Sequence, residues 1–84
     1  MEITVFGPGC TRCDEAEKLA KELAAQRGEE WGTHIEVKKI SDLREMMQHG
    51  VLATPAVAVN GVLKCTGRVP GRDELAGWLD EARA

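Results

Sequence analysis

The feature that most limits the fold of this chain is the dipeptide Asn60-Gly61, which separates two short apolar runs. Asn-Gly between such runs is the strongest short-range signal for a two-residue β-hairpin. We therefore predict paired antiparallel strands over about residues 56–59 and 62–66. The two-residue turn also fixes a register, in which Val59 faces Val62, Ala58 faces Leu63 and Ala56 faces Cys65.

On both sides of the hairpin the hydrophobic pattern alternates between strand and helix periods. Strands are predicted over 2–6 and 34–40, the latter at a sheet edge, and helices from Cys10 to about Arg27, over 41–50 and over 71–84. The order is β-α-β-α-β-β-α. A parallel pair joined by a helix and followed by a hairpin predicts an α/β fold, with a four-stranded mixed sheet and three helices covering both faces.

The helix ends and buried stripes follow from the same pattern. Gly28 is predicted to stop the first helix, which leaves Trp31 in a loop, and Ser41 or Asp42 is predicted to cap the second helix. The residues predicted to face the core are Cys13, Ala16, Ala20, Leu23 and Ala24 on the first helix, Leu43, Met46 and Met47 on the second, and Leu75, Trp78, Leu79 and Ala82 on the third.

Length and charge narrow the class of protein. Eighty-four residues allow one hydrophobic core, so 1–84 is expected to be a single domain. A net charge of -3 argues against nucleic acid or an anionic membrane as partner. The chain has no apolar run of the roughly 20 residues that span a bilayer, and its start lacks the basic and apolar regions of a signal peptide. We expect a cytoplasmic monomer.

Two of the three cysteines form the motif Cys10-Thr11-Arg12-Cys13, at the junction of the first strand and the first helix. In a cytoplasmic chain this spacing indicates redox or metal chemistry. A cysteine at a helix N-terminus has a lowered pKa, because backbone N–H groups and the helix dipole favour the thiolate. Cys13, one turn later on the apolar stripe, should be more buried. An exposed nucleophile beside a shielded thiol suits thiol–disulfide exchange.

The neighbours of Cys10 support this interpretation. Gly7 and Gly9 keep side chains away from the approach to Cys10, so that the disulfide of another protein can reach its sulfur. The positive charge of Arg12 is a candidate for stabilising the Cys10 thiolate, while the acidic residues that follow Cys13 oppose it.

Thr54-Pro55 precedes the first hairpin strand, where proline is tolerated because it donates no ladder hydrogen bond. In this architecture the start of that strand lies beside the N-terminus of the first helix. We predict that the Thr54–Pro55 bond is cis and lies opposite the two cysteines, leaving a backbone edge free to pair with an incoming peptide.

Three motifs together give the chain a family resemblance: GPGCTRC after the first strand, GVLATPA before the hairpin, and GRVPG before the last helix. The chain resembles, over nearly its whole length, the small thioredoxin-like and glutaredoxin-like redox-active disulfide proteins found mainly in archaea and anaerobic bacteria. The resemblance implies a thioredoxin-like fold. It also has differences, since Gly9 stands where thioredoxin has Trp, and Thr11-Arg12 stands where thioredoxin has Gly-Pro.

The resemblance further implies an activity and roles for individual residues. Cys10 is the expected nucleophile, Cys13 the resolving thiol, and Pro55 the cis-proline that faces them, with Thr54 and Gly9 beside the docked substrate. The expected reaction is the reduction of disulfides in target proteins, with re-reduction by a flavin-dependent NADPH reductase. No bound cofactor is expected besides a redox-active Cys10–Cys13 disulfide.

A different class of function stays open, in which Cys10 and Cys13, with Cys65 as a further ligand, hold a soft metal or metalloid. A Cys-x-x-Cys motif supplies only two of the four ligands of a structural zinc site, and His34 and His49 are expected at the surface. Cys65 is interpreted as a small buried core residue, with a place near the dithiol as the alternative.

Overall fold

The computed structural model describes residues 1–9 and 11–83, and four strands in these ranges form one mixed sheet. The strands are β1 (Glu2–Phe6), β2 (Glu36–Ile40), β3 (Ala56–Val59) and β4 (Val62–Thr66), in the order β2-β1-β3-β4. The β1–β2 pair is parallel, and the β1–β3 and β3–β4 pairs are antiparallel. The predicted class, element order and edge position of β2 are confirmed.

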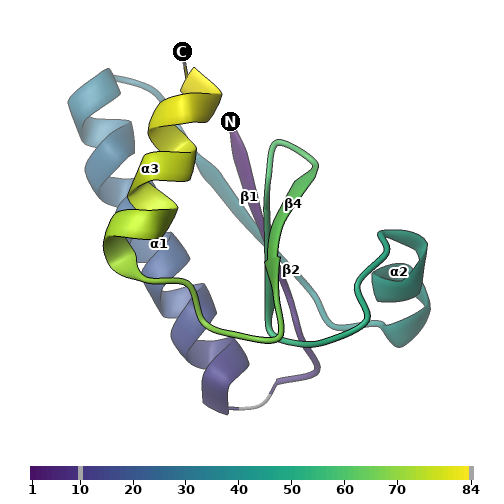
Figure 1. Ribbon diagram of the computed structural model, residues 1–84. Helices are drawn as coiled ribbons and strands as arrows, with labels where there is room; N and C mark the ends of the chain where they lie inside the picture. The colour runs from purple at the N-terminus through teal and green to yellow at the C-terminus, as the bar shows by residue number, and fades with distance from the viewer. Residues whose placement is uncertain (10, 84) are drawn as a thin grey trace.

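Three helices complete the fold: α1 (Thr11–Trp31), α2 (Leu43–Gln48) and α3 (Arg72–Arg83). Figure 1 shows α1 and α3 side by side on one face of the sheet and α2 beyond the other face. Both faces are therefore covered, as predicted, although by helices of very different length. None of the helices in the described part of the chain is long and apolar enough to cross a membrane.

The main core lies between the sheet and the two long helices. The first helix contributes Ala16, Ala20, Leu23 and Ala24 of the stripe predicted for it, and the third contributes Leu75 and Leu79, both fully buried. Trp78 and Ala82 are half-buried and pack against this core. The buried residues of this face are Ile3, Val5, Ala16, Ala20, Leu23, Ala24, Ile35, Val57, Val59, Cys65, Leu75 and Leu79.

The opposite face has a smaller core of Phe6, Met46, Val51, Ala56 and Ala58. Asp42 caps α2, because its carboxylate accepts hydrogen bonds from the backbone N–H groups of the first turn. The prediction that Leu43 and Met47 are buried with Met46 is wrong: their side chains are 69% and 63% exposed. A helix of six residues is too short to bury several side chains against the sheet, and Met46 is the side chain that it buries.

The predicted end of α1 is also wrong, because Gly28 lies inside the helix and Trp31 is in its last turn. The helix ends at Trp31, and the next residue, Gly32, adopts φ 65°. Thr33 N–H donates to the Gly28 carbonyl at 3.0 Å and Gly32 N–H donates to the Glu29 carbonyl at 3.4 Å. Gly28 is needed for another reason. A Cβ there would lie 2.7 Å from the Thr33 carbonyl oxygen.

The hairpin turn forms at Asn60 and Gly61, which adopt φ 50° and 81°. The register predicted next to the turn is confirmed, but the register further along is wrong, because a β-bulge intervenes between Val57 and Ala58. Cys65 therefore pairs with Val57 rather than with Ala56. One extra residue moves a side chain to the other face of a sheet, and Cys65 accordingly lies in the main core.

Candidate functional site

The predicted site residues that the structure describes lie at one end of the molecule, where several loops meet. Figure 1 shows the start of α1 at the same end as the loop that precedes β3 and the loop between β4 and α3. Gly7 N–H donates to the Ile40 carbonyl at 2.9 Å, which ties the loop after β1 to the end of β2. Gly67 N–H donates to the Pro55 carbonyl at 2.8 Å, which joins the other two loops.

Cys13 is fully buried in the first turn of α1, as predicted. Its partner in the motif, Cys10, lies outside the described residues, so the structure gives no geometry for the pair. Arg12 is exposed on the same turn. The roles of all three residues therefore stay predictions.

Gly7 makes room for Cys13, a reason that sequence reasoning missed. A Cβ on Gly7 would overlap Cys13 Sγ and would lie 2.8 Å from Cys13 Cβ. The sulfur of Cys13 thus lies directly against the backbone at the end of β1. Gly9 is exposed and adopts φ 98°, a conformation that side-chain-bearing residues rarely take. Gly7 is therefore required by the close approach of Cys13, whereas Gly9 is required by its backbone conformation.

The Thr54–Pro55 peptide bond is cis, as predicted. Pro55 is fully buried and Thr54 is half-buried, while Leu52 just before them is 92% exposed. The position of this segment relative to both cysteines stays a prediction, because Cys10 lies outside the described part.

Lys39 contributes a positive charge beside the first turns of α1, which sequence reasoning did not anticipate. Its amino group lies 3.4 Å from Asp14 Oδ1 and 3.7 Å from Glu17 Oε1. The hydrogen bond to Asp14 raises the pKa of Lys39, burial opposes this rise, and the charges of Glu17, Asp14 and Cys13 add smaller increases. The sequence feature that could have indicated this charge is the lysine near the end of β2, the strand that runs parallel to β1.

The loop after β4 is held by a second charged pair that sequence reasoning missed. Arg68 Nη1 and Nη2 donate to Glu74 Oε1 and Oε2 at 2.6 and 2.8 Å. Glu74 Oε1 also accepts from the backbone N–H of Gly71 at 3.2 Å. The hydrogen bonds from Arg68 and then from Gly71 lower the pKa of Glu74 to about 2. The spacing of Gly71 and Glu74 is that of a helix capping box, which was the signal available in the sequence.

Comparison with known proteins supplies the family. A family model described as a thioredoxin domain matches residues 1–80. The chain belongs to the thioredoxin domain family. This agrees with the resemblance drawn from the sequence motifs.

Curated relatives of this thioredoxin-family chain come from archaea. A thioredoxin of Methanothermobacter thermautotrophicus is 36% identical over 75 residues, which cover 89% of this chain and 92% of the relative. A thioredoxin of Methanocaldococcus jannaschii is 32% identical over 82 residues, with 93% and 90% covered. Among solved structures, oxidised thioredoxin from Plasmodium falciparum superposes with a TM-score of 0.61 at 15% identity, over 99% of this chain and 81% of that one. This last likeness shows the fold.

In this thioredoxin-family chain Cys65 lies in the main core, as the core interpretation expects. Burial raises the pKa of the Cys65 thiol, and its Sγ contacts the Arg68 carbonyl oxygen at 3.9 Å. His34 and His49 are exposed, and the His49 ring lies 5.3 Å from that of Phe6. Among residues 1–9 and 11–83, no three His, Cys, Asp or Glu side chains lie together as a metal site would require.

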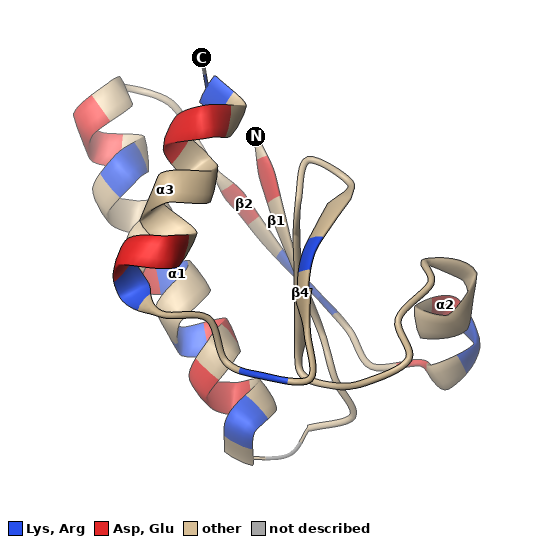
Figure 2. Cartoon of the chain, in the orientation of Figure 1, with Lys and Arg blue, Asp and Glu red and all other residues tan. Residues whose placement is uncertain are grey.

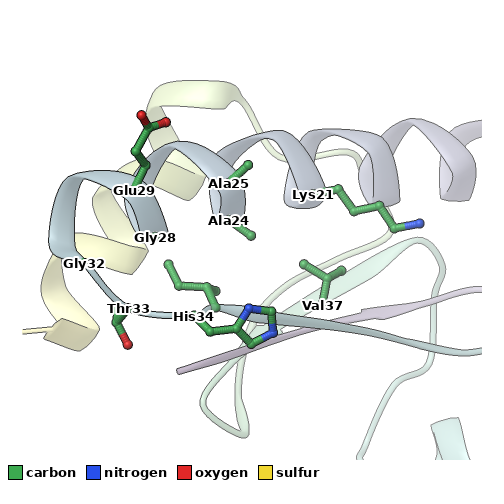
Figure 3. A pocket seen from close by; sticks show the side chains of 10 residues that line it. Lys21, Ala24, Ala25, Gly28, Glu29, Gly32, Thr33, His34 and Val37 are labelled. Atoms are coloured by element: carbon green, nitrogen blue, oxygen red, sulfur yellow. The ribbon is translucent and has the colours of Figure 1, made fainter.

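An open groove of about 740 Å³ lies away from Cys13, between the C-terminal half of α1 and strand β2 (Figure 3). Its lining residues are Lys21, Ala24, Ala25, Gly28, Glu29, Gly32, Thr33, His34, Ile35 and Val37. Figure 2 shows acidic and basic residues interspersed along α1, so no single charge marks this side of the molecule. The groove has apolar walls and contains none of the predicted site residues.

Proposed function

We propose that this protein is a thiol–disulfide oxidoreductase that reduces disulfides in other proteins through Cys10 and Cys13. Membership in the thioredoxin domain family and the thioredoxin fold support a disulfide oxidoreductase in general. One observation carries the finer assignment. Cys13 is fully buried in the first turn of α1, with its sulfur against Gly7, and a second cysteine, Cys10, stands three residues before it in the sequence.

The first step uses Cys10 as the nucleophile. Its thiolate attacks one sulfur of the target disulfide, a bond forms between Cys10 Sγ and that sulfur, and the other target sulfur leaves as a thiolate that takes up a proton. The helix N-terminus favours the attacking thiolate, and Arg12 is the side chain proposed to add to that effect. The product of this step is a mixed disulfide.

The second step uses Cys13 as the resolving thiol. After losing its proton, Cys13 attacks Cys10 Sγ, the intramolecular disulfide forms, and the second target sulfur leaves as a thiolate. Two electrons have then passed from the dithiol to the target. Lys39 is proposed to aid this step, because its positive charge lies beside the first turns of α1, at Asp14 and Glu17.

The Cys10–Cys13 disulfide must then be reduced again for a further cycle. We assign this step to a flavin-dependent NADPH reductase, which supplies two electrons. We also propose that the protein acts as a cytoplasmic monomer without a bound cofactor.

Thr54, Pro55 and Gly9 are proposed to border the docked target. Gly9 is exposed and Thr54 is half-buried, so solvent reaches both residues.

The order of attack can be tested by trapping. Replacing Cys13 with Ser keeps the nucleophile and the docking segment but removes the resolving thiol, so Cys13→Ser should accumulate mixed disulfides with its targets. The measurement is a pull-down from lysate, separated without reductant and then with added dithiol. We expect covalent complexes that the dithiol cleaves.

Two matched variants complete this experiment. Cys10→Ser should trap almost nothing, because it lacks the nucleophile, and Cys65→Ser should behave like the parent, because Cys65 belongs to the core. Equal trapping by Cys10→Ser and Cys13→Ser would contradict the assigned order. Trapping that depends on Cys65 would contradict its structural role.

A further inference from the structure

We propose that Arg68 and Glu74 form a latch that holds residues 67–71, the loop between β4 and α3, as one wall of the site where an extended peptide around a target disulfide docks. This inference rests on the proposed function and deepens it. It names two positioning residues for the docking of a protein disulfide, which a small free disulfide would not need.

The latch joins the loop to the first turn of α3 by three hydrogen bonds. Both oxygens of Glu74 accept from the guanidinium of Arg68, at 2.6 and 2.8 Å, and one of them also accepts from Gly71 N–H at 3.2 Å. Paired donors on a planar guanidinium fix direction as well as distance. The loop is thus fixed near its start by Arg68 and near its end by Gly71.

The same loop contacts the segment around Pro55. Gly67 N–H donates to the Pro55 carbonyl at 2.8 Å, immediately before Arg68. Gly67 adopts φ 76°, and a Cβ on it would lie 3.3 Å from Ala53 Cβ. Figure 1 shows this loop passing along the end of the sheet, beside the segment that leads into β3. A shift of Arg68 would therefore be transmitted to Ala53 and Pro55 through a single residue.

The segment beside this wall has backbone available for a peptide. Within residues 1–9 and 11–83, no hydrogen bond to the backbone of Ala53 or Thr54 is found, whereas the Pro55 carbonyl is already used by Gly67. Leu52 is 92% exposed. An extended peptide that pairs with Ala53 and Thr54 would lie next to the latched loop. A small disulfide has no peptide backbone to pair with these residues and needs no such wall.

The pair is exposed, so its effect should appear in positioning more than in stability. Exposed ion pairs add little to the free energy of unfolding, and the side chains of Arg68 and Glu74 are 51% and 37% exposed. A matched control is available in Arg72, which forms a single contact of 3.0 Å with Glu22 across α3 and α1 and is similarly exposed. Arg72→Met removes the same charge four residues away and leaves the latch intact.

The experiment compares Arg68→Met, Glu74→Gln and Arg72→Met with the parent. Steady-state reduction is measured with dithiothreitol as electron donor, for a folded protein with one exposed disulfide and for hydroxyethyl disulfide. We expect Arg68→Met to raise KM for the protein substrate about fivefold, with kcat and the rate on hydroxyethyl disulfide unchanged, and Arg72→Met to match the parent. Glu74→Gln, which keeps an acceptor for Gly71, should raise KM less.

A second measurement reports on the loop without any catalysis. Hydrogen exchange of the Gly67 amide should be faster in Arg68→Met than in Arg72→Met, because the latch restrains the loop that carries it. Arg68→Lys should restore the KM only in part, since an ammonium group lacks the paired donors.

The outcomes distinguish a failure of the latch from a failure of the proposed oxidoreductase function. An unchanged KM in Arg68→Met, an equal change in Arg72→Met, or an equal loss on hydroxyethyl disulfide would each overturn the latch while leaving the oxidoreductase intact. Failure of the parent to reduce either disulfide would overturn the proposed function, and the latch as a docking element with it. Faster exchange at Gly67 without a change in KM would show a loop restraint that plays no part in docking.

Discussion

The two faces of the sheet differ in how completely they are covered. Among the residues that the structure describes, α1 and α3, of 21 and 12 residues, enclose a core of twelve buried residues on one face. On the other face α2, of six residues, covers a core of five. Cys13 belongs to α1, while the segment before Pro55 follows α2 and contributes Val51 to the smaller core. The proposed resolving thiol is therefore fixed to the well-packed side, and the proposed docking segment to the lightly packed side.

The largest effect should come from the face covered by the long helices. Leu79 is fully buried between α3 and the sheet, so Leu79→Ala removes well-packed atoms and leaves a cavity that rigid neighbours cannot fill. We expect a loss of about 3 kcal/mol in the free energy of unfolding, measured by urea denaturation. A loss below about 1 kcal/mol would mean that this face is no better packed than the other.

A smaller effect is expected under α2. Met46 is buried and provides the contact of this helix with Phe6 and the β3 alanines, but solvent surrounds the helix and lets it settle into the gap. We expect Met46→Ala to cost about 2 kcal/mol in the same measurement, and Met47→Ala, which starts 63% exposed, to stay within about 0.5 kcal/mol of the parent. Equal costs for Met46→Ala and Leu79→Ala would remove the difference between the faces.

The same contrast explains which parts of the fold could be predicted from the sequence. A hydrophobic pattern works well where a helix is long, because the stripe from Cys13 to Ala24 repeats over several turns and has one consistent solution. It fails for α2, where Leu43 and Met47 satisfy the pattern as well as Met46 does, but the helix meets the sheet at one point.

The remaining errors have local causes. Glycine is favoured at a helix end and also where two backbones approach closely. The sequence analysis interpreted Gly28 as a helix end, whereas the structure shows a close backbone approach there. Asn60-Gly61 predicts the register beside the turn, but no local residue type announces the bulge that moves Cys65 to the main core. At the site, the burial of Cys13 and the cis bond at Pro55 were predictable, whereas the pairing of Lys39 with α1 depends on tertiary placement.

The smallest predicted effect is on the loss of folding stability at low pH, which we expect to differ between the two faces of the sheet. The ion pairs found in the described part of the chain join strands, α1, α3 and the loop before α3, and none of them involves α2. Hydrogen bonds from Arg68 and Gly71 lower the pKa of Glu74 from its ordinary value of 4.5 to about 2. Its contribution to stability is therefore complete above pH 4.5 and is lost as the pH falls toward 2.

Replacing Glu74 with Gln removes this titration. The parent should lose stability between pH 4.5 and 2 more steeply than Glu74→Gln, as followed by urea denaturation at a series of pH values, with the two curves parallel above pH 5. Because the pair is exposed, the difference should be smaller than that for Met46→Ala. Glu45→Gln on α2 is the matched control, because no ion pair in the described part of the chain involves α2, and it should change the acid slope less than Glu74→Gln does. An identical change in slope for both variants would show that the acid response is a general charge effect and does not distinguish the two faces.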